Sequence, residues 1–140
     1  MVKPPYGRIT ALDLNKGEFV WQVPHGDGPR DHPAIKHLNL GPLGLAGNAS
    51  GLAHGGGVLT KSLLFMIQPN LSKENWLYIG DNGVIRAFDK ANGNVLWEHE
   101  FDKVPQGTPM TYMHEGKQYV VVAIGGGEQA SELVALRLKS

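Results

Sequence analysis

Short runs of alternating apolar and polar residues, separated by turn-forming residues, make up most of this chain. The runs "ITALDL" (9–14) and "VIRAFD" (84–89) each lead into a turn and then into another apolar run. Alternation with a period of two is typical of a half-buried β-strand, and Gly, Asn and Asp between two such runs are typical of a hairpin. No segment keeps a helical period; the nearest, "EQASELVALRL" (128–138), has β-branched residues and echoes residues 9–14, which favours a strand. The pattern therefore predicts an all-β fold.

Two of the predicted hairpins share one skeleton. Residues 9–21 read "ITALDLNKGEFVW" and residues 85–97 read "IRAFDKANGNVLW", with Ile, Ala, Asp, Gly and Trp at identical spacing. In each copy we expect the aspartate to accept backbone N–H bonds from the turn, and the glycine to take the positive φ that the turn needs. Alternation after each turn predicts an apolar face that buries the tryptophan against a neighbouring sheet. The residues on these faces are Phe19, Trp21 and Val23 in the first copy, and Val95, Trp97, His99 and Phe101 in the second.

The other strand-like runs complete a set of stacked modules. "GVLT" leads through "KS" into "LLFMIQ", "WLYIG" through "DNG" into "VIRAFD", and "TPMTYM" through "HEG" into "KQYVVVAI", before a final "LVALRL". The sharpest hairpin turns are predicted at Asp81-Asn82-Gly83 and His114-Glu115-Gly116. Residues 57–101 hold about four strands, the usual content of one propeller blade. Two strands precede them in residues 8–23, and three follow in an incomplete last blade at residues 108–138.

These counts predict that residues 1–140 form a single fragment of a β-propeller domain. It contains about one complete four-stranded antiparallel blade and two incomplete blades. A long loop over residues 24–56 separates the first strand pair from the complete blade, which accounts for the wide spacing of the two hairpins.

Composition narrows the possible functions. Thirteen basic residues balance thirteen acidic ones, so the chain lacks the basic surface expected of a nucleic-acid-binding protein. It has no cysteine, which excludes disulfides and thiolate metal sites. No apolar run is long enough for a membrane helix, and the first residues do not form a signal peptide. We therefore expect neither a nucleic-acid partner nor a membrane segment in this chain.

The repeated skeleton supports a family resemblance. Two copies of A-x-D-x-x-x-G-x-x-x-W, at Ala11–Trp21 and Ala87–Trp97, resemble the tryptophan-docking motif of the quinoprotein alcohol and glucose dehydrogenases. The run "GTPMTYMHEGKQYVVVAIGGG" (107–127) is similar to the last blade of the glucose dehydrogenase branch. The resemblance implies the C-terminal portion of a propeller that oxidises an alcohol or an aldose. The hydride acceptor would be pyrroloquinoline quinone (PQQ), held with Ca²⁺.

The same resemblance implies where the chemistry lies. The catalytic aspartate and most ligands of PQQ and calcium would belong to blades that precede residue 1. We therefore expect no catalytic residue and no metal ligand in this chain, and no activity when it is isolated. Its implied partners are the remaining blades, a sugar or alcohol substrate, and a quinone or cytochrome that accepts electrons. The implied compartment is the periplasm.

The loop over residues 24–56 holds the candidate cofactor contact. "NLGP" (39–42) partly matches a Gly-Gly-rich segment that approaches PQQ in the family, which makes Asn39 the candidate; the alternative is an asparagine that only stabilises a turn. The loop also contains His25, Asp27, Arg30, Asp31, His32, His37 and His54. Its His and Asp residues match no zinc spacing and are interpreted as a solvated turn. "GGGE" (125–128) departs from the Gly-Gly-His of some glucose-oxidising relatives, so glucose is not singled out as the substrate.

Two other classes of function remain open from the sequence. The chain is also consistent with a non-catalytic propeller module that binds a partner protein, as in related propellers of outer-membrane assembly factors. It is also consistent with a small protein that self-associates to bury its free strand edges. A scaffold needs no loop with His and Asp residues, and that loop favours the dehydrogenase.

Overall fold

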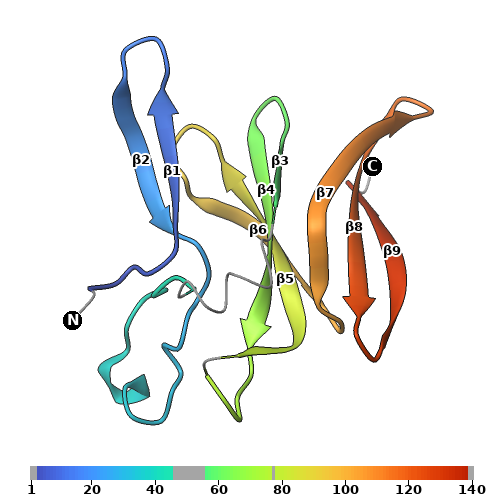
Figure 1. Ribbon diagram of the computed structural model, residues 1–140. Coiled ribbons are helices and arrows are strands. Elements are labelled where there is room, and N and C mark those ends of the chain that lie inside the picture. Colours follow the sequence, from blue (N-terminus) through green and yellow to red (C-terminus); the bar gives the residue numbers. More distant parts are fainter. Residues whose placement is uncertain (1–2, 46–55, 77, 139–140) are drawn as a thin grey trace.

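Three antiparallel sheets make up the computed structural model, which describes residues 3–45, 56–76 and 78–138 (Figure 1). The first sheet pairs β1 (Arg8–Asp13) with β2 (Glu18–Pro24). The second contains β3 (Gly57–Leu59), β4 (Leu63–Leu71), β5 (Ile79–Asp89) and β6 (Val95–Phe101), and the third β7 (Pro105–His114), β8 (Lys117–Gly126) and β9 (Gln129–Arg137). Within each sheet, every strand pairs with its neighbours in sequence. The predicted all-β fold, with one four-stranded blade between two incomplete ones, is confirmed.

The two repeated hairpins share the turn that their common skeleton predicts. The Asp13 carboxylate accepts the backbone N–H of Asn15 at 2.9 Å, and the Asp89 carboxylate accepts that of Ala91 at 2.8 Å. Gly17 and Gly93 have φ values of 71° and 77°, in the left-handed region that glycine adopts without strain. The two turns are therefore equivalent in hydrogen bonding and in backbone conformation.

Trp21 joins the first sheet to the second. Its indole Nε1 donates a hydrogen bond of 2.8 Å to the carbonyl of Lys90, in the turn between β5 and β6. Its ring lies against Gly93, where a Cβ atom would come within 2.7 Å of Trp21 Cε3. Glycine is thus required at position 93 for two reasons, its positive φ and the close approach of the ring. The structural role predicted for Trp21 is confirmed.

The strict alternation predicted after each turn is wrong, because both hairpins contain a β-bulge. The register moves from Ala11↔Trp21 to Leu12↔Phe19, and from Ala87↔Trp97 to Phe88↔Val95. An extra residue in one strand shifts the faces of the residues around it. Phe19 is accordingly 71% exposed and Val95 50% exposed.

Trp97 also differs from its prediction, since it remains 43% exposed. Its ring stacks on His99, with centroids 5.9 Å apart, and His99 makes an edge contact with Phe101. Only Phe101, at the inner end of this series, reaches the hydrophobic core. Among the described residues no turn covers Trp97 as the β5–β6 turn covers Trp21, which is the physical reason for the difference.

The hairpin predicted at Asp81-Asn82-Gly83 is also wrong, because these residues lie within β5, where the register with β4 is irregular. The chain reverses earlier, since Leu71 pairs with Ile79 and Pro69 with Gly83. A Cβ atom on Gly83 would lie within 2.7 Å of Pro105 Cγ, and closer still to the carbonyl of Gln68. Position 83 therefore needs glycine because Pro105 and the Gln68 backbone lie too close for a side chain, and not because the chain turns there. The other predicted turn is confirmed, with positive φ at both Glu115 and Gly116.

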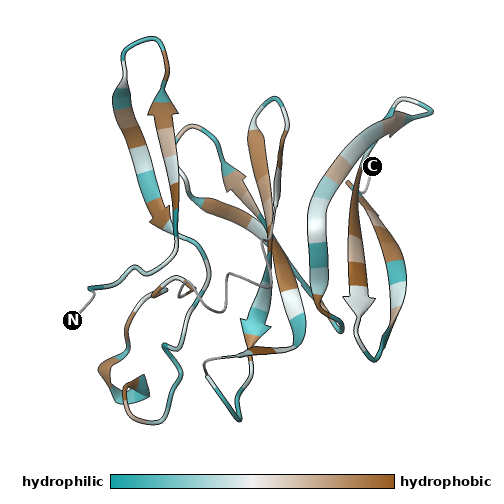
Figure 2. Cartoon of the chain, viewed as in Figure 1, coloured by the Kyte–Doolittle hydropathy of each residue, from teal (hydrophilic) through white to brown (hydrophobic). Residues whose placement is uncertain are grey.

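The hydrophobic core lies between the second and third sheets. Ile67 on β4 and Ile85 on β5 are fully buried against the face of β8. The β8 residues in this cluster are Val120, Val122 and Ile124. Hydrophobic positions are accordingly prominent on β4, β5 and β8 (Figure 2).

The connections between strands fall into two groups at opposite ends of the sheets (Figure 1). Tight turns follow β1, β3, β5 and β7 at one end. The connections after β2, β4, β6 and β8 lie at the other, which we call the loop end. The polar segment after β2 belongs to the loop end, so the candidate chemistry gathers there.

Candidate functional site

The described part of the long loop is folded back on itself. The backbone N–H groups of Leu43, Gly44 and Leu45 donate to the carbonyls of Asp27, Gly26 and His25, each at 2.9 Å. A Cβ atom on Gly26 would lie 2.8 Å from Leu45 Cγ, so these two stretches pack closely. Leu43 and Leu45 are buried. This short ladder gives His25 and Asp27 fixed positions at the loop end.

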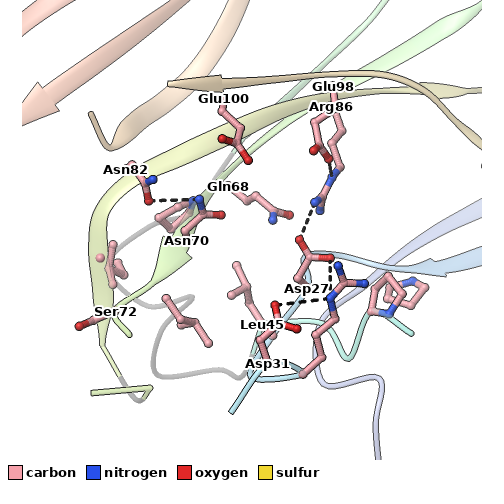
Figure 3. A pocket seen from close by; sticks show the side chains of 18 of the residues that line it. Asp27, Asp31, Leu45, Gln68, Asn70, Ser72, Asn82, Arg86, Glu98 and Glu100 are labelled. Carbon is pink, nitrogen blue, oxygen red and sulfur yellow. Dashed lines mark hydrogen bonds and ion pairs between the residues drawn. The ribbon is translucent and has the colours of Figure 1, made fainter. Parts of the chain in front are cut away.

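Arg86 anchors this loop to the four-stranded sheet (Figure 3). Its guanidinium lies 2.6 Å from Asp27 of the loop and also forms an ion pair with Glu98, its direct partner across the β5–β6 ladder. The Arg86 side chain is only 12% exposed. Burial alone would lower the pKa of Arg86, but its hydrogen bonds to Asp27 and Glu98 outweigh burial and raise it. The guanidinium therefore stays charged and holds loop and strand together.

His25 lies beside this cluster, close enough for the charge of Arg86 to act on it. Its Nδ1 atom is buried and has no hydrogen-bond partner among the described residues. Burial lowers the pKa of His25 below its usual value of 6.5, and the nearby positive charge of Arg86 lowers it further. A neutral ring is thus favoured at the working pH of most proteins.

A cleft of about 1210 Å³ opens between the loop, the end of β2 and the second sheet. Carboxylates dominate the charge of its wall: Asp27, Asp31, Glu74, Asp81, Glu98, Glu100 and Asp102, against Arg30, Lys73 and Arg86. The two arginines are already opposed by acids, since Arg30 lies 3.7 Å from Asp27 and Arg86 binds Asp27 and Glu98. The cleft therefore presents a net acidic surface.

The candidate contact Asn39 lies outside this cleft. It follows the short 3₁₀ helix η1 (Lys36–Leu38), is exposed, and has a left-handed backbone with φ 48° and ψ 46°. Asparagine is one of the few residues besides glycine that tolerates this conformation. The turn role considered as the alternative thus has a structural basis, and a cofactor contact at Asn39 stays a prediction.

The loop histidines and aspartates do not form a metal site in the part of the chain that is described. No three His, Asp or Glu residues there are placed to hold a metal ion. The Nδ1 atom of His32 instead accepts the backbone N–H of Ala34, and its ring meets the edge of Trp76 at 5.6 Å. His54 lies outside the described residues.

Sequence reasoning missed Arg86 and Glu98. Both belong to segments that were interpreted only as a repeated hairpin. The available signal was a charged residue within the apolar run "VIRAFD" together with an acid across the predicted turn. The third member, Asp27, is distant in sequence and could not be paired with them.

Replacing Arg86 with methionine is expected to lower the free energy of unfolding by about 1–2 kcal/mol, because Asp27 and Glu98 lose their shared cation. The loop should also become more sensitive to proteolysis between Pro24 and Leu45. Urea unfolding and limited proteolysis measure the two effects. Arg30→Met is the control, since its ion pairs at 3.7 and 3.9 Å are longer and more exposed. Equal effects of the two variants would contradict the anchoring role of Arg86.

The unfolding free energy is expected to fall as the pH drops below about 6.5, the usual pKa of histidine. The unfolded chain then binds a proton at His25 that the folded chain resists, so acid favours unfolding. The measurement is the urea midpoint between neutral and mildly acidic pH, for the wild type and for His25→Gln. His37→Gln, at an exposed position, is the control. If the urea midpoint of His25→Gln changes with pH as much as that of the wild type, the pH dependence arises from other groups.

Among the described residues, no helix is long and apolar enough to cross a membrane.

Comparison with known proteins identifies relatives along most of the chain. Residues 1–120 match the family described as the glucose/ethanol/alcohol dehydrogenase β-propeller domain of the PQQ type. The chain is 33% identical over 133 residues to the quinate/shikimate dehydrogenase (quinone) of Acinetobacter baylyi, with 93% of the chain covered. It is 31% identical over 134 residues to the quinoprotein glucose dehydrogenase of Escherichia coli. It is 34% identical over 125 residues to the glycerol dehydrogenase large subunit of Gluconobacter thailandicus. Each of these two matches covers 89% of the chain.

The chain spans only a small part of these relatives. It covers 14% of the quinate/shikimate and glucose dehydrogenases and 15% of the glycerol dehydrogenase subunit. The matches therefore concern a few blades of a much larger propeller.

Proposed function

The chain belongs to the PQQ-type β-propeller family of the glucose, ethanol and alcohol dehydrogenases, and on that basis we propose that it is the C-terminal portion of an enzyme that oxidises an alcohol or an aldose. The observation that carries the proposal is the family match over residues 1–120, on a chain whose Trp21 docks on the next blade. In such an enzyme the hydride of the substrate would pass to PQQ, with Ca²⁺ bound beside the cofactor. The remaining blades are the direct partners of this chain.

The acidic cleft itself does not fit PQQ. The cofactor is a planar quinone that bears several carboxylates, and a site for it needs unopposed cations or hydrogen-bond donors. Here Arg86 is occupied by Asp27 and Glu98, and further acids surround it. We therefore assign the cleft a structural role, the fixation of the loop, and derive no chemical step from it. Any contribution of this chain to PQQ is proposed at the exposed tip of the loop, at Asn39.

The electron acceptor and the compartment of the whole enzyme are further parts of the proposal. The names of two relatives contain the words quinone and cytochrome c, which supports one of these as the acceptor. We propose a periplasmic location for the whole enzyme, by family resemblance. Secretion of a reporter fused to the natural upstream sequence tests this location, and retention of the reporter in the cytoplasm would contradict it.

The isolated chain is expected to show no dehydrogenase activity. Reduction of a dye with glucose, quinate, glycerol or ethanol, in the presence of added PQQ and Ca²⁺, is the measurement. The reason is that the chain covers about one seventh of its relatives, and the proposal places the catalytic residues in blades outside this chain. Turnover above that of free PQQ would overturn the proposal that the catalytic residues lie elsewhere.

The Asn39 contact is tested by titrating the chain with PQQ and following tryptophan fluorescence. If the amide binds the cofactor, Asn39→Ala and Asn39→Gly should both weaken binding severalfold, because both remove it. If Asn39 only forms the turn, the glycine variant should bind like the wild type, since glycine keeps the left-handed backbone. His37→Ala, in the short helix that precedes Asn39, is the control. The proposed contact would be overturned if Asn39→Gly binds PQQ as tightly as the wild type does. It would also be overturned if the wild type shows no saturable binding of PQQ.

A further inference from the structure

A buried amide without a partner lies in the wall of the acidic cleft. Gln68 on β4 is only 3% exposed, and its side chain ends in the cleft (Figure 3). The amide makes no hydrogen bond in the part of the chain that the structure describes. Burying an amide without hydrogen bonds costs free energy, so a bound group has to supply the missing partner.

Unopposed carboxylates lie on the same side of the second sheet. Glu98 and Glu100 alternate along β6, Asp102 follows directly after the strand, and all three border the cleft. The Glu98 carboxylate is used by Arg86. Neither Glu100 nor Asp102 forms an ion pair with any described residue, and both are exposed. Their charges are therefore available to a cation that enters the cleft.

The register of the sheet places the amide and one of these acids in a single row. Gln68 pairs with Val84 on β5, and Val84 pairs with Glu100 on β6. Residues directly opposite each other point to the same face, and two strand spacings separate the Gln68 and Glu100 backbones by about 10 Å. A guanidinium between them can donate to both side chains, because its five N–H groups form a fork.

The outer edge of β6 offers a second set of partners. β6 ends the strand order of the second sheet, so among the described residues it is paired on one side only. Residues 95–100 are all exposed. The second sheet already contains the four strands of a complete blade, so neighbouring blades have no strand to add at this edge. The free edge can hydrogen-bond an extended segment, whose alternate side chains would then face the cleft.

We propose that the acidic cleft binds an extended basic segment of another protein, which pairs with the free edge of β6. Arginine or lysine at alternate positions of the segment would face Glu100 and Asp102, and one guanidinium would also donate to the Gln68 amide. A protein segment fits better than a free amine, because the acids follow the period of a strand and only a second strand satisfies the edge groups of β6. This role adds to the fixation of the loop and does not depend on the proposed dehydrogenase activity.

Fluorescence anisotropy of a labelled peptide tests the proposal on the full 140-residue chain. The probe is a capped peptide in which arginine and threonine alternate, and we expect saturable binding that added salt weakens. A peptide of the same composition, with its arginines consecutive, is expected to bind severalfold more weakly because it cannot match the strand period. Free arginine and spermidine, as competitors, are expected to displace the peptide only at much higher concentration.

Three variants locate the binding site. Gln68→Leu removes the amide and is expected to weaken binding about tenfold, as for the loss of one hydrogen bond to a charged group. Glu100→Gln, at an exposed position, is expected to weaken it about twofold to fivefold. Glu128→Gln is the control, since it makes the same change of charge at an exposed position between β8 and β9. Circular dichroism checks each fold, and Glu100→Gln keeps the test valid if Gln68→Leu does not fold.

Four results would each overturn the proposal. The first is no saturable binding of the alternating peptide, which would leave the acids as charges that only protect the edge of β6 from pairing. The second is equal binding of the two peptides, which would show attraction by net charge alone. The third is displacement by free arginine or spermidine at the concentration of the peptide, which would make the cleft a site for a small cation. The last is wild-type affinity in Glu100→Gln, which would place the peptide elsewhere.

Discussion

Replacing Gly93 with asparagine is expected to lower the free energy of unfolding by about 2–3 kcal/mol, because the new side chain occupies the place of the Trp21 ring. A Cβ atom there would lie 2.7 Å from Trp21 Cε3 and 3.0 Å from Val23 Cγ1. The ring would have to move, and its hydrogen bond to the Lys90 carbonyl would be lost. Urea unfolding, followed by circular dichroism, measures the change.

The same replacement at Gly17 isolates docking from backbone strain. Both glycines have nearly equal positive φ and follow equivalent aspartate-capped turns, so the conformational cost of asparagine is similar at both positions. Only Gly93 has a ring against it. Gly17→Asn is therefore expected to cost less than about 1 kcal/mol. Equal losses at the two positions would show that turn conformation, and not tryptophan docking, determines the effect.

The hairpins could be predicted from the sequence because their determinants are local. An aspartate that caps the turn, a glycine at positive φ and a β-branched or aromatic strand act within about ten residues of each other. Because residues 9–21 match residues 85–97, the same turn could be predicted for both copies. The confirmed turn at Glu115 and Gly116 follows the same local logic.

The features that could not be predicted depend on details outside these local patterns. The bulges at Val20 and Leu96 alter which face each residue takes, and a period-two pattern does not reveal where an extra residue is inserted. The ion pair of Arg86 with Asp27 joins residues 59 positions apart. Such a pair is visible only once the loop ladder has brought Asp27 to the sheet.

A cofactor contact in the loop over residues 24–56 stays a prediction. The loop end holds the polar segment, but the cluster of ion pairs forms around Arg86 and not around the loop histidines. The reason is that a charged group in an apolar strand must be neutralised, so the fold supplies it with two carboxylates. A histidine in a glycine-rich loop carries no such requirement.

Replacing Gly83 with alanine is expected to cost about 3 kcal/mol or more, because there is no room for a methyl group. The added carbon would lie within 2.7 Å of Pro105 Cγ and closer still to Pro105 Cδ and the carbonyl of Gln68. Pro105 is among the most completely buried side chains and begins β7, so relief would require β5 and β7 to separate. Neither a backbone carbonyl nor a proline ring can move aside as a flexible side chain does.

The control for this substitution is Gly41→Ala, at an exposed loop position where the added carbon meets nothing within 4 Å and φ is not positive. There alanine is expected to be neutral or slightly stabilising, since it restricts the unfolded chain. A small effect at Gly83 would mean that β5 does not run through Asp81-Asn82-Gly83 against Pro105, and would restore a turn at these residues. A large, selective loss at Gly83 would establish that this Asn-Gly pair belongs to a strand, with close contact between sheets as the reason for its glycine.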